Sequence, residues 1–272
     1  MVRLVCIDVD GTLVGTGGTV LAATWAAAER ARAAGIHLAI CSGRPAFGLA
    51  RGYAERLDPA GWHVFQNGAS IVQLAERRSL STSLPRELVD HLIGRARVTG
   101  WTLELYTDTE YAVECTDARA RAHADLLGVP FRPRAFDTLD DPIVRAQWLM
   151  PVELESTALA EEIPGLEMTP STSPVMPDTS FINMTAAGVN KARAVRVIAA
   201  ELAVTLAETM FVGDGRNDLE AMREVGWAIA MGNAEPELHD IARHVVSHVD
   251  DAGLAEALGL AMDARAAVAP ER

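Results

Sequence analysis

The chain has 272 residues, 49% of them hydrophobic, and a formal net charge of −13. That length can hold one large domain or two modest ones. The acidic balance argues against a nucleic-acid or membrane-surface partner, since either would favour a basic face. The three cysteines lack metal-like spacing, and we find no signal-peptide pattern and no apolar run long enough to cross a bilayer. These features predict a reduced, cytoplasmic protein without a membrane span.

The first predicted strand is the apolar run Leu-Val-Cys-Ile at residues 4–7, and it leads into Asp-Val-Asp-Gly-Thr at residues 8–12. Residues two apart in an extended chain project to the same side, so Asp8 and Asp10 should stand together where the strand ends. Two crowded carboxylates repel each other unless a cation or a shared proton relieves them. Mg²⁺, which prefers oxygen ligands, is the natural partner.

A helix over residues 21–34 and a second strand over 37–41 should follow. The sequence Ser-Gly-Arg-Pro at residues 42–45 predicts that the next helix begins at Pro45, because serine precedes many helices and proline favours the first turn. This junction would bring the Ser42 hydroxyl and free backbone N–H groups together as an anion site. The alternative is an ordinary helix cap. A third strand at 62–66 precedes the turn sequence Asn67-Gly68-Ala69.

From Leu84 the pattern changes to helices and antiparallel strands. We predict a helix around 88–96, a hairpin at 101–106 and 111–115, and a helix at 118–127. A strand at 143–150, a helix at 154–163 and strands at 166–169 and 180–184 follow, the last two separated by a loop rich in proline and serine. The pattern therefore predicts an inserted α+β domain at residues 84–186 and a discontinuous core formed by residues 1–83 and 187–272. Five arginines of the insertion are candidate anion readers or solvated surface: Arg119, Arg121, Arg132, Arg134 and Arg145.

The core resumes with Gly-Val-Asn-Lys at residues 188–191 and a helix whose apolar stripe includes Val195 and Ile198. Lysine and arginine total 24, yet Lys191 is the only lysine. An ammonium is electrostatically unfavourable at the positive start of a helix unless it faces an anion. Arginine's planar fork does not replace a point charge between small anionic groups, so Lys191 is expected in a functional site.

A strand at 209–212 ends in Gly-Asp-Gly-Arg-Asn-Asp at residues 213–218, a second cluster of oxygen ligands. A strand at 227–230 and the sequence Met-Gly-Asn-Ala at 231–234 follow. Alternating strands and helices predict an α/β core with a doubly wound, mainly parallel, Rossmann-like sheet. Ligands of such sheets bind beyond the carboxyl ends of the strands, where all these motifs fall.

In this order the segments resemble the four motifs of the haloacid dehalogenase superfamily, in particular its Cof-like phosphatases with a type IIB cap. The resemblance spans residues 4–258 and is weakest in the insertion. It implies a Mg²⁺-dependent phosphatase that hydrolyses small phosphomonoesters, such as sugar phosphates or related metabolites, through an aspartyl phosphate. The partner would be a small phosphorylated metabolite, and the protein a monomer or homodimer.

The resemblance also implies residue roles. Asp8 would be the nucleophile and Asp10 the general acid and then base, while Ser42 and Lys191 would hold the phosphoryl group. The metal would be bound by Asp8, Asp10 through its backbone carbonyl, Asp214 and Asp218, the last directly, through water or by holding Lys191. Substrate-binding candidates are Thr12, Gly43, Arg44, Asn67, Asn217 and Asn233.

Three alternatives remain open on the sequence. A phosphomutase similar to the phosphomannomutases would use the same motifs. A Mg²⁺-dependent binding protein on this scaffold would not need the full set of catalytic side chains. A phosphoacceptor signalling domain would lack the insertion and the acid at Asp10. A family dehalogenase is excluded because it would lack the second aspartate, and a P-type transport ATPase because it would need membrane spans.

Overall fold

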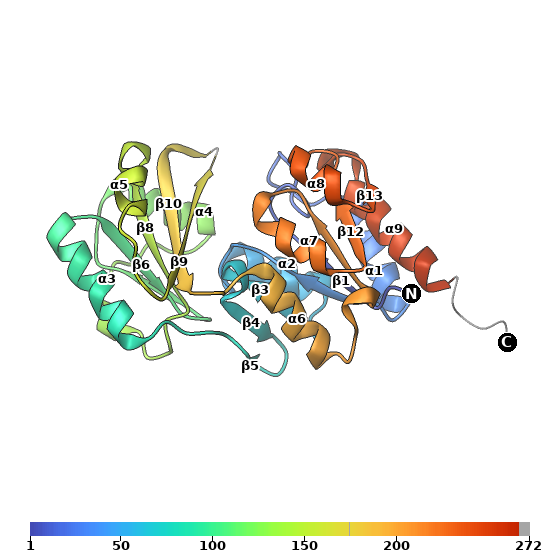
Figure 1. Ribbon diagram of the computed structural model, residues 1–272, viewed down its shortest axis with the longest axis horizontal. Coiled ribbons are helices and arrows are strands. Elements are labelled where there is room, and N and C mark those ends of the chain that lie inside the picture. Colours follow the sequence, from blue (N-terminus) through green and yellow to red (C-terminus); the bar gives the residue numbers. More distant parts are fainter. Residues whose placement is uncertain (174, 267–272) are drawn as a thin grey trace. The chain divides into compact units, whose positions relative to one another are not determined.

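The computed structural model describes residues 1–173 and 175–266, and contacts divide the chain into two units (Figure 1). The first unit comprises Met1–Gly43, Gly52–Ser79 and Asn190–Arg272. The second comprises Arg44–Arg51 and Leu80–Val189. Compared with the predicted insertion at 84–186, the second unit extends further at both ends and also takes a short segment that follows Ser42.

A five-stranded parallel sheet forms the centre of the first unit, in the order β13-β12-β11-β1-β2. Its strands are β1 (Leu4–Ile7), β2 (His37–Ile40), β11 (Thr209–Gly213), β12 (Trp227–Ala230) and β13 (His244–Val245). All four residues of β1 are buried, as expected for a parallel strand covered on both faces. The predicted doubly wound, mainly parallel sheet is confirmed.

Helices connect these strands, and crossovers between parallel strands are almost always right-handed. The chain moves from β1 to β2 in one direction and from β11 to β12 in the other, so α1 and α7 lie on opposite faces of the sheet. Helix α1 packs against α9, and α6 packs against α7. The helices are α1 (Ala22–Ala33), α2 (Leu49–Leu57), α6 (Lys191–Glu201), α7 (Leu219–Glu224), α8 (Pro236–Ile241) and α9 (Gly253–Ala266). Because β1, β2 and β11 are parallel, their carboxyl ends meet at one edge of the sheet.

The helix predicted from Pro45 begins instead at Leu49. Gly48 has φ +62°, a left-handed conformation that a right-handed helix does not contain. A Cβ at this position would lie 2.3 Å from the Leu127 carbonyl oxygen, so the close approach of two backbones requires glycine here. The predicted helix start was therefore wrong, and Ser42 is not the residue that caps α2.

A small antiparallel sheet of β3 (Trp62–Phe65), β4 (Ser70–Gln73) and β5 (Arg78–Ser79) adjoins β2. Val64 of β3 forms a parallel bridge with Cys41, just beyond β2. Beside it, the buried His63 ring accepts the Ile40 backbone N–H at Nδ1 (3.2 Å), which leaves Nε2 to donate to the Asp58 carbonyl (2.8 Å). The His63 side chain thus supplies a hydrogen bond at the edge of the parallel sheet. Burial lowers its pKa to about 4.

We expect His63 to make the fold less stable in mild acid. The unfolded chain takes up the proton near pH 6.5, whereas the folded protein resists it until about pH 4. This contribution to stability is complete above pH 6.5 and is lost as the pH falls toward 4. Between pH 7.5 and pH 5 the free energy of unfolding should fall by about 2 kcal/mol from this residue alone.

Urea unfolding of the wild type and of His63→Gln at both pH values measures this contribution. The glutamine amide can still accept one hydrogen bond and donate another, but it does not titrate. The difference between the two proteins should therefore change with pH, and a constant difference would contradict the assignment.

The second unit is built on a five-stranded antiparallel sheet in the order β7-β6-β8-β10-β9. Its elements are α3 (Arg86–Thr99), β6 (Thr102–Tyr106), β7 (Tyr111–Val113), α4 (Ala118–Leu127), β8 (Arg145–Pro151), α5 (Glu155–Leu159), β9 (Leu166–Ser173) and β10 (Met176–Ala186). One face of the sheet presents Leu105, Trp148 and Ile182 to a core shared with Val89 and Leu92 of α3. The predicted α+β elements are present in the predicted order.

The loop expected between 169 and 180 is largely strand. β9 runs to Ser173 and β10 starts at Met176, with Ser171 opposite Phe181 and a register shift farther on. Pro170 does not prevent this pairing because β9 is an edge strand, where a missing N–H is tolerated. The segment is rich in residues with low strand propensity, which is why we predicted a loop. That prediction was wrong because pairing with β10 outweighs the local propensity.

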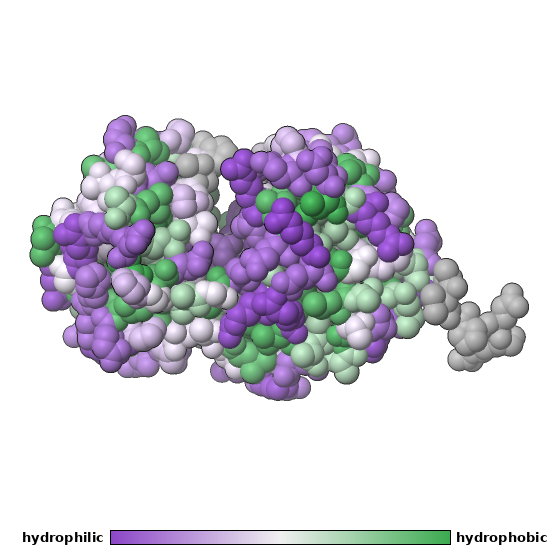
Figure 2. Space-filling view, viewed as in Figure 1, coloured by the Kyte–Doolittle hydropathy of each residue, from purple (hydrophilic) through white to green (hydrophobic). Residues whose placement is uncertain are grey.

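The visible face of the molecule mixes polar and apolar residues (Figure 2). Figure 2 shows hydrophobic residues in small patches between hydrophilic ones on the face in view. Over the residues that the structure describes, no helix has the length and apolar character needed to cross a membrane. Four tryptophan rings are each covered by an arginine guanidinium, whose planar shape suits a cation–π contact. The pairs are Trp25 with Arg56, Trp62 with Arg78, Trp101 with Arg95 and Trp227 with Arg243.

Candidate active site

The first motif forms a tight loop at the carboxyl end of β1. The Asp8 N–H continues the sheet by donating to the Val212 carbonyl (3.0 Å), and the Val9 carbonyl then accepts from Leu13 and Val14. Asp8 is buried, with 7% of its surface exposed, whereas Asp10 is exposed. The two carboxylates thus differ in environment, although both lie at the same strand end.

Lys191 enters the site from the first position of α6. The Asn190 side chain caps this helix by accepting the Arg193 N–H (2.8 Å). The Lys191 Nζ lies 2.6 Å from Asp8 Oδ1 and 2.6 Å from Asp218 Oδ1, and the lysine is 1% exposed. Burial alone would lower the pKa of Lys191, but the two carboxylates outweigh burial and raise it, so the amine is an ammonium at neutral pH.

Asp218 holds the loop that follows β11 as well as the lysine. Its Oδ2 accepts the backbone N–H groups of Asp214 (3.1 Å) and Gly215 (3.2 Å), while Oδ1 accepts from Lys191. Gly213 permits this turn, because a Cβ there would lie 2.4 Å from Asp218 Oδ2. The completely buried Asp218 therefore positions two neighbouring segments of the site.

Carboxylate oxygens of Asp8, Asp214 and Asp218 lie within 4.8 Å of one another. Burial, followed by the charges of Asp218 and Asp214, raises the pKa of Asp8 despite the adjacent ammonium. Burial and the Asp218 charge likewise raise the pKa of Asp214 to about 6. Three carboxylates beside one ammonium leave uncompensated negative charge, and their oxygen donors suit a hard divalent cation.

Asp214 is fixed from two sides. The buried Thr12 hydroxyl donates to Oδ1 (3.1 Å), and the Asn233 amide reaches Oδ2 (3.3 Å). Gly11 has φ +82°, and a Cβ there would lie 2.1 Å from Asp214 Oδ2, so only glycine allows this approach. Thr12 and Asn233, predicted as substrate-binding residues, thus contact a predicted metal ligand.

Ser42 and the Asn67 turn form the neighbouring part of the site. The Ser42 N–H donates to the Val64 carbonyl (2.9 Å), and its carbonyl accepts the Asn67 N–H (2.9 Å). Asn67 has φ +55°, and its side-chain oxygen accepts from the Asn217 amide (3.2 Å). A Cβ on Gly43 would lie 3.2 Å from that same oxygen. The structure therefore brings together four of the predicted site residues: Ser42, Gly43, Asn67 and Asn217.

A family model described as haloacid dehalogenase-like hydrolase matches residues 5–258, which include the aspartates, the serine and the lysine of the predicted motifs. The chain belongs to this family. The predicted resemblance is confirmed, and so is the predicted enzyme class, a phosphomonoester hydrolase.

Similar proteins span nearly the whole of this hydrolase. A 5-amino-6-(5-phospho-D-ribitylamino)uracil phosphatase of Bacillus subtilis is 27% identical over 263 residues, which are 94% of each chain. A haloacid dehalogenase-like hydrolase of Bacteroides thetaiotaomicron superposes with a TM-score of 0.83 and 25% identity over 96% of this chain and 99% of that one. A sugar phosphatase of subclass IIB shares the fold, with a TM-score of 0.77 and 23% identity over 95% of this chain and 98% of that one.

The second unit of the hydrolase contains the remaining predicted residues. Arg44 belongs to this unit. Arg145 is the buried member of the five candidate arginines; it donates to Asn183 (2.9 Å) and lies over the Tyr106 ring. Arg119 binds the Asp178 carbonyl and Arg134 binds the Tyr111 carbonyl, so both hold the unit's own backbone.

Buried polar groups beside Arg145 were not found from the sequence. Glu104, completely buried in β6, accepts hydrogen bonds from Tyr106 and pairs with His123 of α4 (2.8 Å). Gln147 of β8 also reaches the Glu104 carboxylate (3.4 Å). Glu104 and Gln147 alternate with apolar residues along their strands, so the sequence places them on the face of the sheet opposite the apolar core. The same pattern does not show whether polar side chains on that face are buried or solvated.

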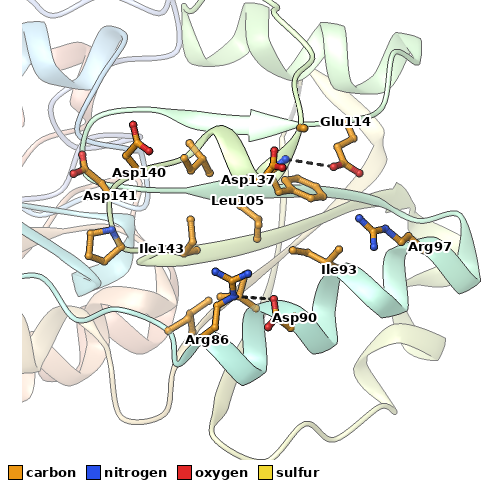
Figure 3. Close-up of a pocket in the computed structure, with 16 residues that line it drawn as sticks. Arg86, Asp90, Ile93, Arg97, Leu105, Glu114, Asp137, Asp140, Asp141 and Ile143 are labelled. Carbon is orange, nitrogen blue, oxygen red and sulfur yellow. Dashed lines mark hydrogen bonds and ion pairs between the residues drawn. The ribbon is translucent and has the colours of Figure 1, made fainter.

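A cavity of about 730 Å³ lies on the other face of this sheet (Figure 3). Its walls come from α3 and from residues 135–143, with Leu105 of β6 between them. Arg86 pairs with Asp90 (2.9 Å) within α3, and Glu114 accepts the Phe136 N–H (3.3 Å). None of the residues predicted from the motifs lines this cavity, so the candidate active site is the edge of the parallel sheet in the first unit.

Proposed function

We propose that this hydrolase is a Mg²⁺-dependent phosphatase of small phosphomonoesters and that Asp8 forms an aspartyl phosphate. One observation carries the proposal: Lys191 Nζ lies 2.6 Å from both Asp8 and Asp218, with the Asp214 carboxylate in the same cluster. A buried ammonium among three carboxylates can neutralise a phosphoryl group that arrives beside Asp8. The ammonium of Lys191 donates directly to the Asp8 side chain.

In the proposed reaction, a carboxylate oxygen of Asp8 attacks phosphorus as the bond from phosphorus to the ester oxygen breaks. Asp10 protonates the leaving oxygen, then takes a proton from the water that hydrolyses the aspartyl phosphate. Its exposed position suits proton exchange, whereas the buried Asp8 is shielded from solvent. Ser42 and Lys191 hold phosphoryl oxygens, as phosphoryl transfer depends mainly on positioning and charge neutralisation.

The donor set at this edge fits Mg²⁺. Asp8, Asp214 and the Asp10 backbone carbonyl would hold it, while Asp218 supports the site through Lys191 and the backbone of Asp214. Both Asp218 oxygens already accept hydrogen bonds from these groups. When bound, Mg²⁺ would offset the carboxylate charge and polarise the phosphoryl group.

We further propose that the second unit acts as the cap, with residues 84–186 as its main part, and that the substrate is a small phosphorylated metabolite. The Bacillus subtilis relative acts, by its name, on a phosphorylated ribitylamino pyrimidine. Phosphate esters of sugars and polyols are the corresponding class for this enzyme.

The test is release of inorganic phosphate from a panel of sugar phosphates, polyol phosphates, nucleotides and pyridoxal phosphate, with Mg²⁺ and with excess EDTA. We expect release from at least one sugar or polyol phosphate, and loss of that release in EDTA. Release that is unaffected by EDTA would overturn the metal requirement. Interconversion of sugar phosphate isomers without free phosphate would favour the phosphomutase.

A further inference from the structure

The Asn233 side chain joins three segments of the first unit. It follows β12, and its Nδ2 donates to the Gly11 carbonyl (2.8 Å) and to Asp214 Oδ2 (3.3 Å). Its Oδ1 accepts the Val249 backbone N–H (2.9 Å). The Gly11 carbonyl directly follows Asp10 in the first motif, so one amide links both acidic strand ends to the segment around Val249.

The direction of this amide is fixed by chemistry. A backbone N–H can only donate, so the side-chain oxygen must face Val249 and the NH₂ group must face Gly11 and Asp214. Both hydrogens of that NH₂ group then have a protein acceptor. A substrate would have to displace one of these contacts in order to use Asn233 as a donor.

Asp214 is consequently held by one donor on each oxygen. Thr12 donates to Oδ1 (3.1 Å) and Asn233 to Oδ2 (3.3 Å), which sets the plane of the carboxylate. Groups that hydrogen-bond a metal ligand orient it, and their loss typically weakens metal binding. Asn233 also holds the Gly11 carbonyl, one peptide beyond the Asp10 carbonyl that is a proposed ligand.

We propose that Asn233 is a positioning residue that orients Asp214 and, through the Gly11 carbonyl, holds the turn that follows Asp10 for a divalent cation, and that it is not a substrate contact. This inference rests on the proposed Mg²⁺ site. It assigns the Val249 segment a role in the site as well, because the Val249 N–H determines which way the amide faces.

The experiment measures Mg²⁺ affinity of the substrate-free, full-length protein by calorimetry, for the wild type and Asn233→Ala. We expect the dissociation constant to rise about 10- to 100-fold in the variant. At saturating Mg²⁺, kcat should recover in part and the substrate KM should match that of the wild type. A raised KM with unchanged Mg²⁺ affinity would overturn the inference and make Asn233 a substrate contact.

Asp250→Ala is the matched control. Asp250 lies beside Val249 and accepts the Thr16 backbone N–H (3.0 Å) and hydroxyl (2.6 Å), away from Asp214. Its loss loosens the same segment without removing the amide's contacts, so Mg²⁺ affinity should be unchanged. Equal weakening in both variants would mean that general loosening is responsible, and would overturn the inference.

A second variant covers the case in which Asn233→Ala does not fold. Asn233→Asp keeps the acceptor for Val249 and the shape of the side chain, but it cannot donate to Gly11 or Asp214. We expect weaker Mg²⁺ binding despite the added negative charge, and unchanged or tighter binding would overturn the inference. Absence of Mg²⁺ binding by the wild type would instead overturn the proposed function itself.

Discussion

Asp8→Asn is expected to lower phosphate release by roughly 10⁴-fold or more, because the amide is not a nucleophile toward phosphorus. The fold should remain intact or become more stable. Burial and the neighbouring Asp218 and Asp214 raise the pKa of Asp8, so its charged form is disfavoured in the folded protein. The amide relieves that repulsion and can still accept a hydrogen bond from Lys191. Steady-state phosphate release and thermal unfolding measure the two effects.

Asp263→Asn is the control for the chemical change, since Asp263 is an exposed aspartate on α9. It should match the wild type in both measurements. Turnover near the wild-type rate in Asp8→Asn would refute Asp8 as the nucleophile. If Asp8→Asn loses both its activity and its folded state, the expected gain in stability from relieved charge repulsion is wrong.

Lys191→Met should abolish turnover and also lower the free energy of unfolding by about 3–5 kcal/mol at pH 7.5, the typical effect of breaking a buried ion pair. Methionine fills a similar volume, but it leaves the buried carboxylates of Asp8 and Asp218 without their cation. Burial and mutual repulsion then raise carboxylate pKa values in the folded state above those of the unfolded chain. Relative to the wild type, which shares the His63 contribution, the variant should therefore gain stability as the pH falls.

Urea unfolding of the variant and the wild type at pH 7.5 and pH 5.5 tests the direction of this change in the free energy of unfolding. Lys191→Arg serves as the comparison, because it keeps the charge but cannot place one nitrogen between two carboxylates as compactly. We expect it to recover much of the stability and little of the turnover. If Lys191→Met is as stable as the wild type at both pH values, the cluster does not depend on the ammonium.

The parts of the fold set by local pattern were predictable from the sequence. The run at residues 4–7 is β1, the apolar stripe after Lys191 is α6, and the helix expected at 118–127 is α4 (Ala118–Leu127). The juxtaposition of Asp8, Lys191 and Asp214 also followed, because parallel strands bring their carboxyl ends to one edge.

Other features depend on contacts between segments that are distant in sequence. Gly48 delays α2 because its backbone approaches that of Leu127, and no local signal near Pro45 encodes that approach. Asn233 could be marked as a site residue from its motif, but its contacts with Asp214 and Val249 are tertiary. Glu104 lies in an alternating strand, which predicts its side of the sheet and not its burial beside His123.

The single lysine also makes the site chemically addressable. Within these 272 residues Lys191 carries the only side-chain amine, and it is 1% exposed. A reagent that acylates amines can reach that side chain only when the edge of the parallel sheet opens. The rate at which one acyl group is added to Lys191, followed by peptide mass spectrometry, therefore reports the opening of this site without any engineered label. A ligand that closes the site should slow that rate, so the same reaction offers a way to find substrates that does not depend on turnover.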